Sequence, residues 1–324
     1  MLAVGVFSLL ALGCGTAQVS SPDGEFALTL PSHPGQLRWH ADGFSLVESS
    51  AKPNGNEMGA RGKDAAGRFT FLTFLFVLSD LGPLNSERCR DGMIAMEKKS
   101  NSRLTVSGTF EMTQSDGQKI ALIVYSSPGR DKKNVYMLRG FIADADLCGD
   151  MEFYSDAPIA ENDPDLKKVF ATYRLDTKHI AEFKETFSYA QILFDHHMYP
   201  AAAPVFELAL TRLGDDDLDP KTWRRVATDQ AGMAYGISGN IAKARALFNE
   251  AIAKDPDYPM YYYNLACADA EEKKLDEAQL HLKQAFDRKA NVIRGENLPD
   301  PTKDDSFLLY RGNKQFWEFL EQLH

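Results

Sequence analysis

The sequence predicts an α+β domain, built mainly from an antiparallel sheet with helices, followed by an all-α solenoid of helical hairpins. From about residue 25 to residue 176, apolar and polar residues alternate as they do in half-buried strands. From about residue 180 the period becomes helical, and the helical segments repeat at an interval of 34 residues. We therefore predict a signal segment at 1–20, an α+β domain at 21–176, about three helical-hairpin units at 180–290 and a capping segment at 291–324.

The N-terminal segment is predicted to direct export. Leu2 to Gly13 is apolar, has the length of a signal-peptide core and is too short to span a bilayer. The stretch "ALGC" resembles a bacterial lipobox, which implies lipidation of Cys14, although no Lys or Arg precedes Arg38. Cleavage after Ala17 is one alternative, and a buried first element of the fold is another. We expect an extracytoplasmic protein: periplasmic, secreted or an outer-membrane lipoprotein.

The composition argues against one class of partner. Hydrophobic residues make up 44% of the chain and charged residues 25%, which is ordinary for a globular protein. The formal net charge is −10, and Lys and Arg are not clustered. Because nucleic-acid binding relies on clustered cations, no nucleic-acid partner is expected. A lipid anchor is the membrane attachment that the sequence suggests, with no transmembrane span in the mature protein.

The α+β domain is predicted from its strand segments. "FALTL" and "FSLVES" alternate, and "RFTFLTFLFVL" becomes continuously apolar, as a central strand does. Two strands flank "SDGQ", whose Asp-Gly pair is a hairpin signal. "NVYMLRGFIADA" and "GDMEFYS" form another predicted pair, and "DPDLKKVFATYRL" closes the domain with a helix.

One helix is predicted in the middle of this domain, in "NSERCRDGMIAMEKK". Ser86 is its expected N-cap, and Cys89, Met93 and Met96 share a face. With this helix, the hairpins, "GEFALTLPSHPGQLRW" at the start and "LKKVFATYRL" at the end, the domain resembles the PsbP-like fold of small exported proteins.

A disulfide between Cys89 and Cys148 is predicted. Cys89 lies on the inward face of the helix, and Cys148 lies between two late strands that such a helix can cover. Export would place both in an oxidising compartment. The alternative is two buried free cysteines.

The second half repeats with small residues at fixed positions. Ala244, Phe248 and Ala251 match Ala278, Leu282 and Ala285 at an offset of 34, and Gly232 matches Ala266. Small residues let helices approach closely, and the large residue fills the gap between them. This pattern resembles the tetratricopeptide repeat (TPR). Ala202, Phe206 and Ala209 give a more degenerate first unit at an offset of 42, in which "GDDDLDPK" accounts for the excess.

The aromatic tail after the third unit is not a further repeat. "ENLPDPTKDDSFLLYRGNKQFWEFLEQL" resembles the terminal segment of bacterial TPR end-of-group proteins. A solenoid needs such a segment, because its last hydrophobic face is otherwise exposed.

The concave face of the repeats is the predicted partner-binding groove. Successive helical residues point about 100° apart, so Tyr261, Tyr262 and Tyr263 cannot form one platform. In the repeat register Tyr262 is a core residue, and Tyr261 lies toward the helix start or the outer side. The groove candidates are Phe187, Gln191, Phe194, Asp229, Met233, Tyr263 and Cys267. This set lacks the cations that would hold a C-terminal carboxylate, and it suits apolar partner side chains better. Alternatively, the chain's own residues fill the groove.

No catalytic motif emerges from the sequence. The zinc-peptidase, phosphate-loop, nucleophile-elbow and CxxC patterns are absent. His196 and His197 are adjacent, so their side chains diverge on a helix and predict no metal site. We expect a non-catalytic binding or scaffolding protein of the cell envelope, without a cofactor, whose partner is a protein or peptide. The alternative is a small-ligand-binding protein that uses the sheet domain, and a hydrolase is a third hypothesis.

Overall fold

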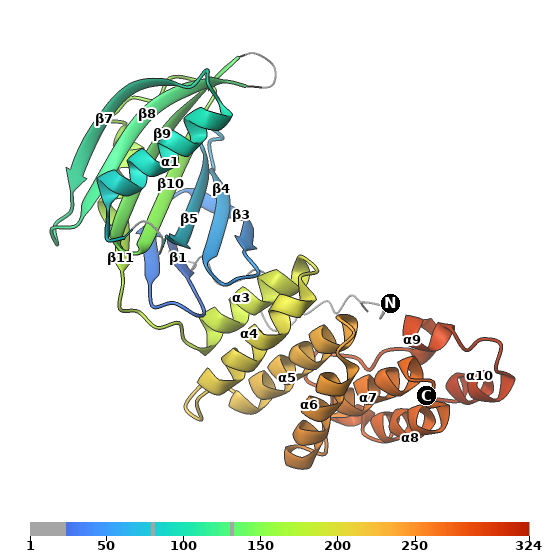
Figure 1. Cartoon of the computed structure of the whole chain (residues 1–324). Helices are drawn as coiled ribbons and strands as arrows, with labels where there is room; N and C mark the ends of the chain where they lie inside the picture. The colour runs from blue at the N-terminus through green and yellow to red at the C-terminus, as the bar shows by residue number, and fades with distance from the viewer. Residues whose placement is uncertain (1–23, 79–81, 130–132, 324) are drawn as a thin grey trace. The chain divides into compact units, whose positions relative to one another are not determined.

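The computed structural model describes residues 24–78, 82–129 and 133–323 (Figure 1). The predicted signal segment at 1–20, with the alternatives at Cys14 and Ala17, lies outside the described residues. The chain divides into two compact units. We call the described residues up to Ile192 the sheet unit and those from Leu193 onward the helical unit. The predicted fold class is confirmed: an antiparallel sheet domain with helices precedes stacked, TPR-like helix pairs.

A large antiparallel sheet forms the centre of the sheet unit. Its strands lie side by side in the order β3 (Phe44–Ala51), β4 (Glu57–Asp64), β5 (Thr70–Val77), β10 (Leu147–Ser155), β9 (Asn134–Ala145), β8 (Lys119–Pro128) and β7 (Thr105–Thr113), and β6 (Leu84–Asn85) pairs with β9. The continuously apolar segment is β5, between β4 and β10 as predicted for a central strand. The two predicted hairpins are β7–β8 and β9–β10.

Strand β4 is missing from the predicted set because its segment, "EMGARGKD", has glycines and charges in place of alternating large apolar residues. In the sheet, Gly59 and Gly62 lie opposite Phe74 and Phe71 of β5. A Cβ atom on either glycine would overlap the facing phenylalanine ring. The glycines therefore leave room for aromatic side chains of the neighbouring strand to lie over β4.

A second, smaller layer covers one face of the large sheet. It consists of the antiparallel strands β1 (Glu25–Thr29), β2 (Gln36–His40) and β11 (Arg174–Asp176), together with α2 (Pro164–Thr172). Aromatic rings fill the space between the layers. Phe26 stacks on Trp39 at 5.3 Å, and both rings meet Phe71 of β5 edge-on. Phe153 of β10 meets Phe170 of α2 in the same way.

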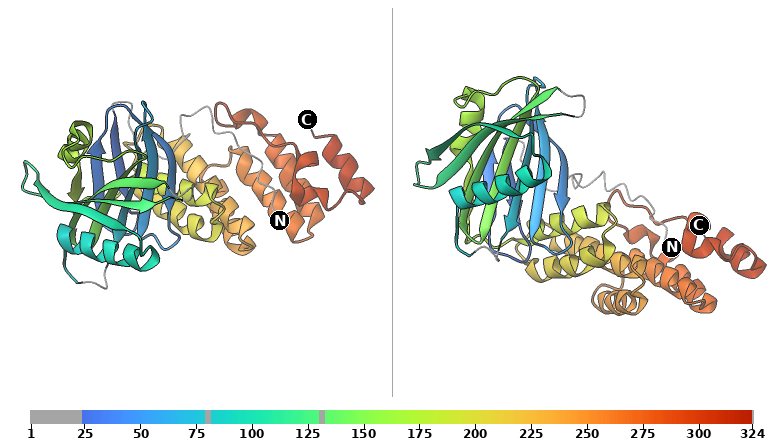
Figure 2. Two further views of the ribbon diagram at one scale, coloured as in Figure 1. Left: turned by 90° about the horizontal axis from the view of Figure 1, so that it is seen from above. Right: turned by 45° about the horizontal axis from the view of Figure 1, so that its top comes forward.

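Helix α1 (Ser86–Ser100) lies across the other face, over β8 and β9 (Figures 1 and 2). Its N-cap is Asn85, whose side chain accepts a hydrogen bond of 2.9 Å from the backbone of Arg88, and not the predicted Ser86. Ser86 is buried, and its hydroxyl donates to the Lys119 carbonyl at 2.6 Å. The register of the inward face also differs from the prediction, because Ile94 is buried whereas Met96 is 53% exposed.

Helix α3 (Phe183–Asp195) belongs largely to the sheet unit. The carboxylate of Glu185 accepts a hydrogen bond of 2.8 Å from Gln36 of β2. The buried hydroxyl of Tyr189 donates to the Lys52 carbonyl at 2.8 Å. These bonds fix the first predicted repeat helix to the sheets, so the compact sheet unit extends beyond residue 176.

The helical unit continues with α4 (Tyr199–Arg212), α5 (Pro220–Ile237), α6 (Ile241–Lys254), α7 (Pro259–Glu271) and α8 (Leu275–Phe286). Its repeated small residues lie where the pattern requires them. A Cβ atom on Gly232 of α5 would overlap the ring of Phe248 of α6, and Ala244 and Ala278 are both buried. Close approach of successive helices therefore depends on these small residues.

The tail contains two 3-10 turns, η2 (Lys289–Asn291) and η3 (Pro301–Lys303), and the helices α9 (Asp305–Leu308) and α10 (Lys314–Glu321). Phe307, Phe316 and Leu320 are buried in one apolar cluster with residues of α7 and α8. The tail thus covers the last helix pair.

Candidate functional site

The three consecutive tyrosines of α7 face three different neighbours, and all three are buried. Tyr261 packs against Phe248 of α6, at 6.3 Å between ring centroids. Tyr262 lies under the guanidinium of Arg288, at 4.5 Å from its ring centroid. Tyr261 lies near the start of α7, which is one of the two predicted placements, and its burial rules out the other, the outer side.

Tyr263 and Cys267 do not line an open groove, which corrects the prediction for both. The tail lies on them: the Tyr263 hydroxyl donates to Asp304 at 3.0 Å, and its ring meets Phe307 at 6.0 Å. The exposed fractions are 1% for Tyr263 and 4% for Cys267. Burial raises the pKa of the Cys267 thiol well above its usual range, with the Asp304 carboxylate adding to the shift. The third unit's groove position is therefore packing between the repeat and the tail.

Asp229 is also buried beneath the tail, contrary to its predicted role. Its carboxylate accepts a hydrogen bond of 2.6 Å from Asn264 of α7. Burial raises the pKa of Asp229 well above its usual range, and the nearby Glu296 carboxylate raises it further. Glu296, in the tail segment before η3, accepts a hydrogen bond of 2.8 Å from Tyr258, and burial raises its pKa as well. This cluster joins two repeats to the tail and leaves no anionic surface for a basic partner at Asp229.

The remaining groove candidates differ in how far their side chains are exposed to solvent. Phe187 and Phe194 are buried, and Phe194 packs edge-on against Phe206 of α4 at 6.2 Å, so their predicted openness is wrong. Gln191 and Met233 are half-buried. Met233 lines a small cavity of about 60 Å³ together with Tyr263 and Cys267, and Pro299 and Asp304 of the tail also line it. The structure thus brings three of the seven predicted groove residues around one small cavity, and it does not join the whole set as one accessible surface.

A larger pocket, which the sequence analysis missed, lies between α4, α5 and α6. Its volume is about 760 Å³. This lies within the range of about 300–1,000 Å³ that is usual for ligand pockets. Leu210 of α4, Leu247 and Ala251 of α6 and the ring of Tyr261 contribute apolar lining. We call this the α4–α6 pocket.

Polar contacts join the three helices beside the α4–α6 pocket. Glu207 of α4 forms an ion pair of 2.9 Å with Lys243 near the start of α6, and it accepts a hydrogen bond from Tyr235 of α5. Further along, Leu210 of α4 and Ala251 of α6 both line the pocket. The floor is α5, from which the buried Thr228 lines the pocket.

The longer spacing between the first and second units is the sequence signal for this pocket. Residues that correspond in the second and third units are 34 apart, but α5 begins at Pro220, 39 residues before α7 begins at Pro259, so α5 starts five residues earlier in its unit than α7 does. The additional turn carries Lys221 and Arg224, and both line the pocket. The insertion therefore does more than offset the repeat, because it lengthens α5 and adds two cations to the wall of the pocket.

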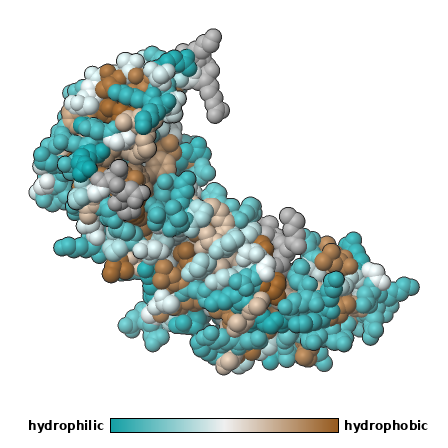
Figure 3. Space-filling view, viewed as in Figure 1, coloured by the Kyte–Doolittle hydropathy of each residue, from teal (hydrophilic) through white to brown (hydrophobic). Residues whose placement is uncertain are grey.

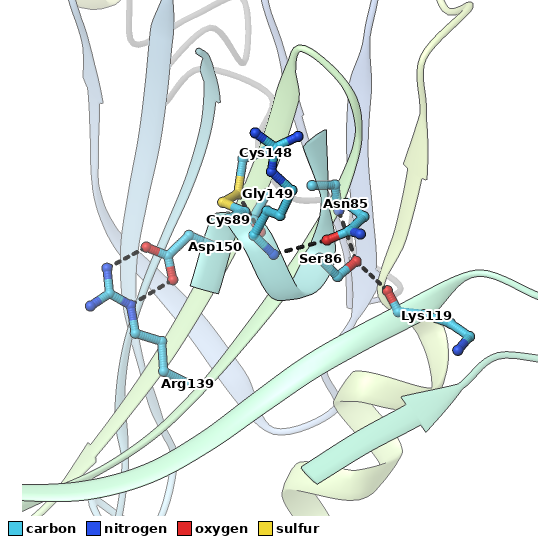
Figure 4. The surroundings of a disulfide bond; sticks show 10 residues. Asn85, Ser86, Cys89, Lys119, Arg139, Cys148, Gly149 and Asp150 are labelled. Carbon is cyan, nitrogen blue, oxygen red and sulfur yellow. Dashed lines mark hydrogen bonds and ion pairs between the residues drawn. A yellow bond between two sulfur atoms is a disulfide. The ribbon is translucent and has the colours of Figure 1, made fainter. Parts of the chain in front are cut away.

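In the sheet unit, the disulfide is present: Cys89 of α1 is bonded to Cys148 of β10, with 6.4 Å between their Cα atoms (Figure 4). Both cysteines are buried in the apolar cluster beneath α1. A bond of this kind forms and persists in oxidising compartments.

A buried ion cluster lies beside the disulfide, beneath the same helix. The guanidinium of Arg139 binds both oxygens of Asp150 at 2.8 and 2.6 Å, and it also binds Glu97 of α1 at 2.6 Å (Figure 4 shows the Asp150 pair). The hydroxyls of Tyr125 and Tyr154 donate to the carboxylate of Glu152. Burial raises the pKa of Asp150 to about 6, against the opposing effect of Arg139.

This ion cluster is satisfied internally. Its single guanidinium meets carboxylates on two sides, and the tyrosines supply the donors that Glu152 lacks. With its charged atoms occupied by one another, the cluster connects α1 to the sheet and is not arranged as an active site.

A separate pocket of about 330 Å³ lies at the end of β2 and β4 in the sheet unit. Its charges are paired: Arg68 binds Asp165 at 2.6 Å, and His40 contacts Asp42 at 2.9 Å. Its lining combines apolar residues such as Phe44 and Val169 with these paired charges, whereas a small-ligand-binding role would favour a deep, wholly apolar pocket.

No helix among the described residues combines the length and apolar character needed to cross a membrane. In the same residues, His, Cys, Asp and Glu side chains form no group of three or more that could hold a metal ion.

No protein-family profile matches the sequence, and no curated protein matches it. Several solved structures are similar to it, including the following two. A protein from Bacteroides thetaiotaomicron has 9% identity and a TM-score of 0.32, covering 66% of this chain and 78% of its own. A multi-domain immunophilin from Arabidopsis thaliana has 10% identity and a TM-score of 0.26, covering 82% of this chain and 99% of its own. At these TM-scores neither likeness supports an argument about function.

Proposed function

We propose that this is a non-catalytic binding or scaffolding protein of the cell envelope, and that its helical unit binds a protein partner. The single observation that carries the proposal is the α4–α6 pocket of about 760 Å³, which lies between stacked helices and opens among exposed side chains. Stacked helix pairs present long surfaces of this kind to other proteins.

The surface of the helical unit supports binding through a pocket more than through a broad apolar face. On the face seen in Figure 3, hydrophobic residues form separate small patches among hydrophilic ones. A partner that enters a pocket buries its anchoring side chains without needing a large apolar patch around them.

The location in the envelope rests on two observations. The Cys89–Cys148 disulfide fits an oxidising compartment, in which such bonds persist. The apolar N-terminal segment has the length of a signal-peptide core. Attachment through a lipidated Cys14 and release after cleavage at Ala17 are both compatible with this location.

Site-specific photo-crosslinking in the native envelope tests the proposal. A photoreactive phenylalanine analogue replaces Leu247, which lines the pocket, and in a matched variant it replaces Leu280, which is 55% exposed on α8. We expect a discrete protein adduct from position 247 and none from position 280. Failure to form an adduct both at Leu247 and at Leu210, the lining residue of α4, would overturn the proposal.

The alternative of a small-ligand-binding sheet domain has less support. Its described pocket is less than half the volume of the α4–α6 pocket, and its charged residues pair with one another.

A further inference from the structure

We infer that the α4–α6 pocket recognises an acidic segment of the partner protein that also carries apolar side chains, with Arg224 pairing with a partner carboxylate. This inference rests on the proposed function and specifies the chemistry of its ligand.

The charges around the pocket are nearly all paired within the protein. Arg225 binds Asp255 through two nitrogens at 2.6 and 3.1 Å, and Lys221 lies 3.6 Å from the same carboxylate. Lys254 binds Glu250 at 2.6 Å. Asp255 and Glu250 are therefore neutralised by neighbouring cations and present little negative charge to a ligand.

Arg224 differs from these cations. Its side chain is exposed and lines the pocket, and the guanidinium has no ion-pair or hydrogen-bond partner among the described residues. Four cationic and three acidic side chains line the pocket, so it carries an excess of positive charge in a chain whose net charge is −10. A guanidinium presents a planar fork of N–H donors that matches a carboxylate in two parallel hydrogen bonds.

The apolar part of the pocket explains why the ligand must be mixed in character. Leu210, Leu247 and Ala251 are half-buried, so their remaining exposed area becomes covered only when a ligand enters. A segment with an acidic residue beside a large apolar residue satisfies both parts of the pocket. The exposed rim, formed by residues such as Lys221 and Lys254, leaves the entrance open to a side chain of another protein.

Asp215 is the one lining group that opposes an anion. It lies in the loop before α5, is exposed and has no partner among the described residues. Its negative charge weakens attraction for a carboxylate at the rim, so its removal should strengthen binding. Asp215→Asn is therefore expected to increase the affinity for an acidic ligand, and Arg224→Ala to decrease it.

The test uses the full-length protein and two fluorescent ten-residue peptides, one of alternating Asp and Leu and one of alternating Asn and Leu. Fluorescence anisotropy at low ionic strength should show tighter binding of the Asp–Leu peptide, with affinity falling as salt is added. Arg224→Ala should weaken binding of that peptide by about tenfold or more, as expected for loss of a charge-assisted hydrogen bond. Asp215→Asn should tighten it.

Arg294→Ala is the matched control, because Arg294 is an exposed arginine of the same unit outside the pocket. Equal binding of the two peptides, or equal loss in the Arg224 and Arg294 variants, would overturn the inference.

Failure of this inference can be distinguished from failure of the proposed function. An adduct at Leu247 together with equal peptide binding means that a partner binds without charge selection. Absence of an adduct at both Leu247 and Leu210 contradicts the binding function itself.

Discussion

The hydroxyl of Tyr263 in α7 donates a hydrogen bond of 3.0 Å to Asp304, which lies 41 residues later in the tail. This bond joins the last helix pair to the segment that covers it, in an apolar cluster that includes Phe307 and Phe316. A position that repeat geometry assigns to a partner is therefore occupied by the protein itself.

Replacing Tyr263 should destabilise the helical unit. Tyr263→Ala removes a fully buried ring, and we expect a loss of about 3–5 kcal/mol in the free energy of unfolding. Tyr263→Phe removes only the hydroxyl, with an expected loss of about 1–3 kcal/mol because the buried Asp304 carboxylate loses one of its donors. Urea unfolding followed by the fluorescence of Trp317 of α10, with Trp39 and Trp223 replaced by Phe, measures both. Retention of full stability by Tyr263→Ala would show that the tail does not pack on α7.

The cluster of Asp229 and Glu296 should make the helical unit less stable as pH rises. The folded-state pKa of each carboxyl is raised, mainly by burial, so the native protein holds protons that the unfolded chain releases. Their stabilising contribution is complete below the unfolded-state pKa, about 3.9 for Asp, and is lost as pH rises through the folded-state pKa.

Asp229→Asn should remove part of this pH dependence and raise stability at pH 8, by about 1.4 kcal/mol for each unit by which the pKa was raised. Urea unfolding from pH 4 to pH 8 with the same Trp317 signal gives the comparison. Asp257→Asn, at an exposed position, is the control. Parallel pH profiles for wild type and Asp229→Asn would contradict the prediction.

The disulfide should contribute strongly to the stability of the sheet unit. Cys89 and Cys148 are separated by 59 residues. The chain-entropy model gives about 4 kcal/mol for a loop of this length. Double replacement by Ala should lower the free energy of unfolding of the sheet unit by this amount, measured by near-ultraviolet circular dichroism in urea. Reductant should shift the wild type toward the double variant and leave the double variant unchanged. Peptide mapping without reduction checks the bond directly.

Gly232 should be required for the approach of α5 to α6. A Cβ atom there would overlap the Phe248 ring, so Gly232→Ala should cost about 1–3 kcal/mol despite the better helix propensity of alanine. Gly312→Ala is the matched control, since a Cβ at Gly312 has no neighbour within 4 Å. The control should change stability by less than about 0.5 kcal/mol. Similar effects of both substitutions would refute the steric explanation.

The sequence by itself determined the features that depend on local period and spacing. Alternation predicted β5 and the two hairpins, because successive side chains of a strand point to opposite faces. The interval of 34 residues predicted the helix pairs, and the placement of Cys89 on a helix facing late strands predicted the disulfide.

Only the tertiary structure decided which repeat positions remain open to a partner. Tyr263 and Cys267 occupy groove positions in the repeat register, but whether such positions face solvent depends on where the tail returns, and a local pattern does not encode a contact across 41 residues. Arg224, in contrast, stays exposed and lines a pocket. The additional helical turn that carries it can be recognised in the sequence as an insertion, but its place in a pocket depends on how α4, α5 and α6 pack together. Periodicity specifies what each helix can bury, whereas packing between distant segments decides what it leaves exposed.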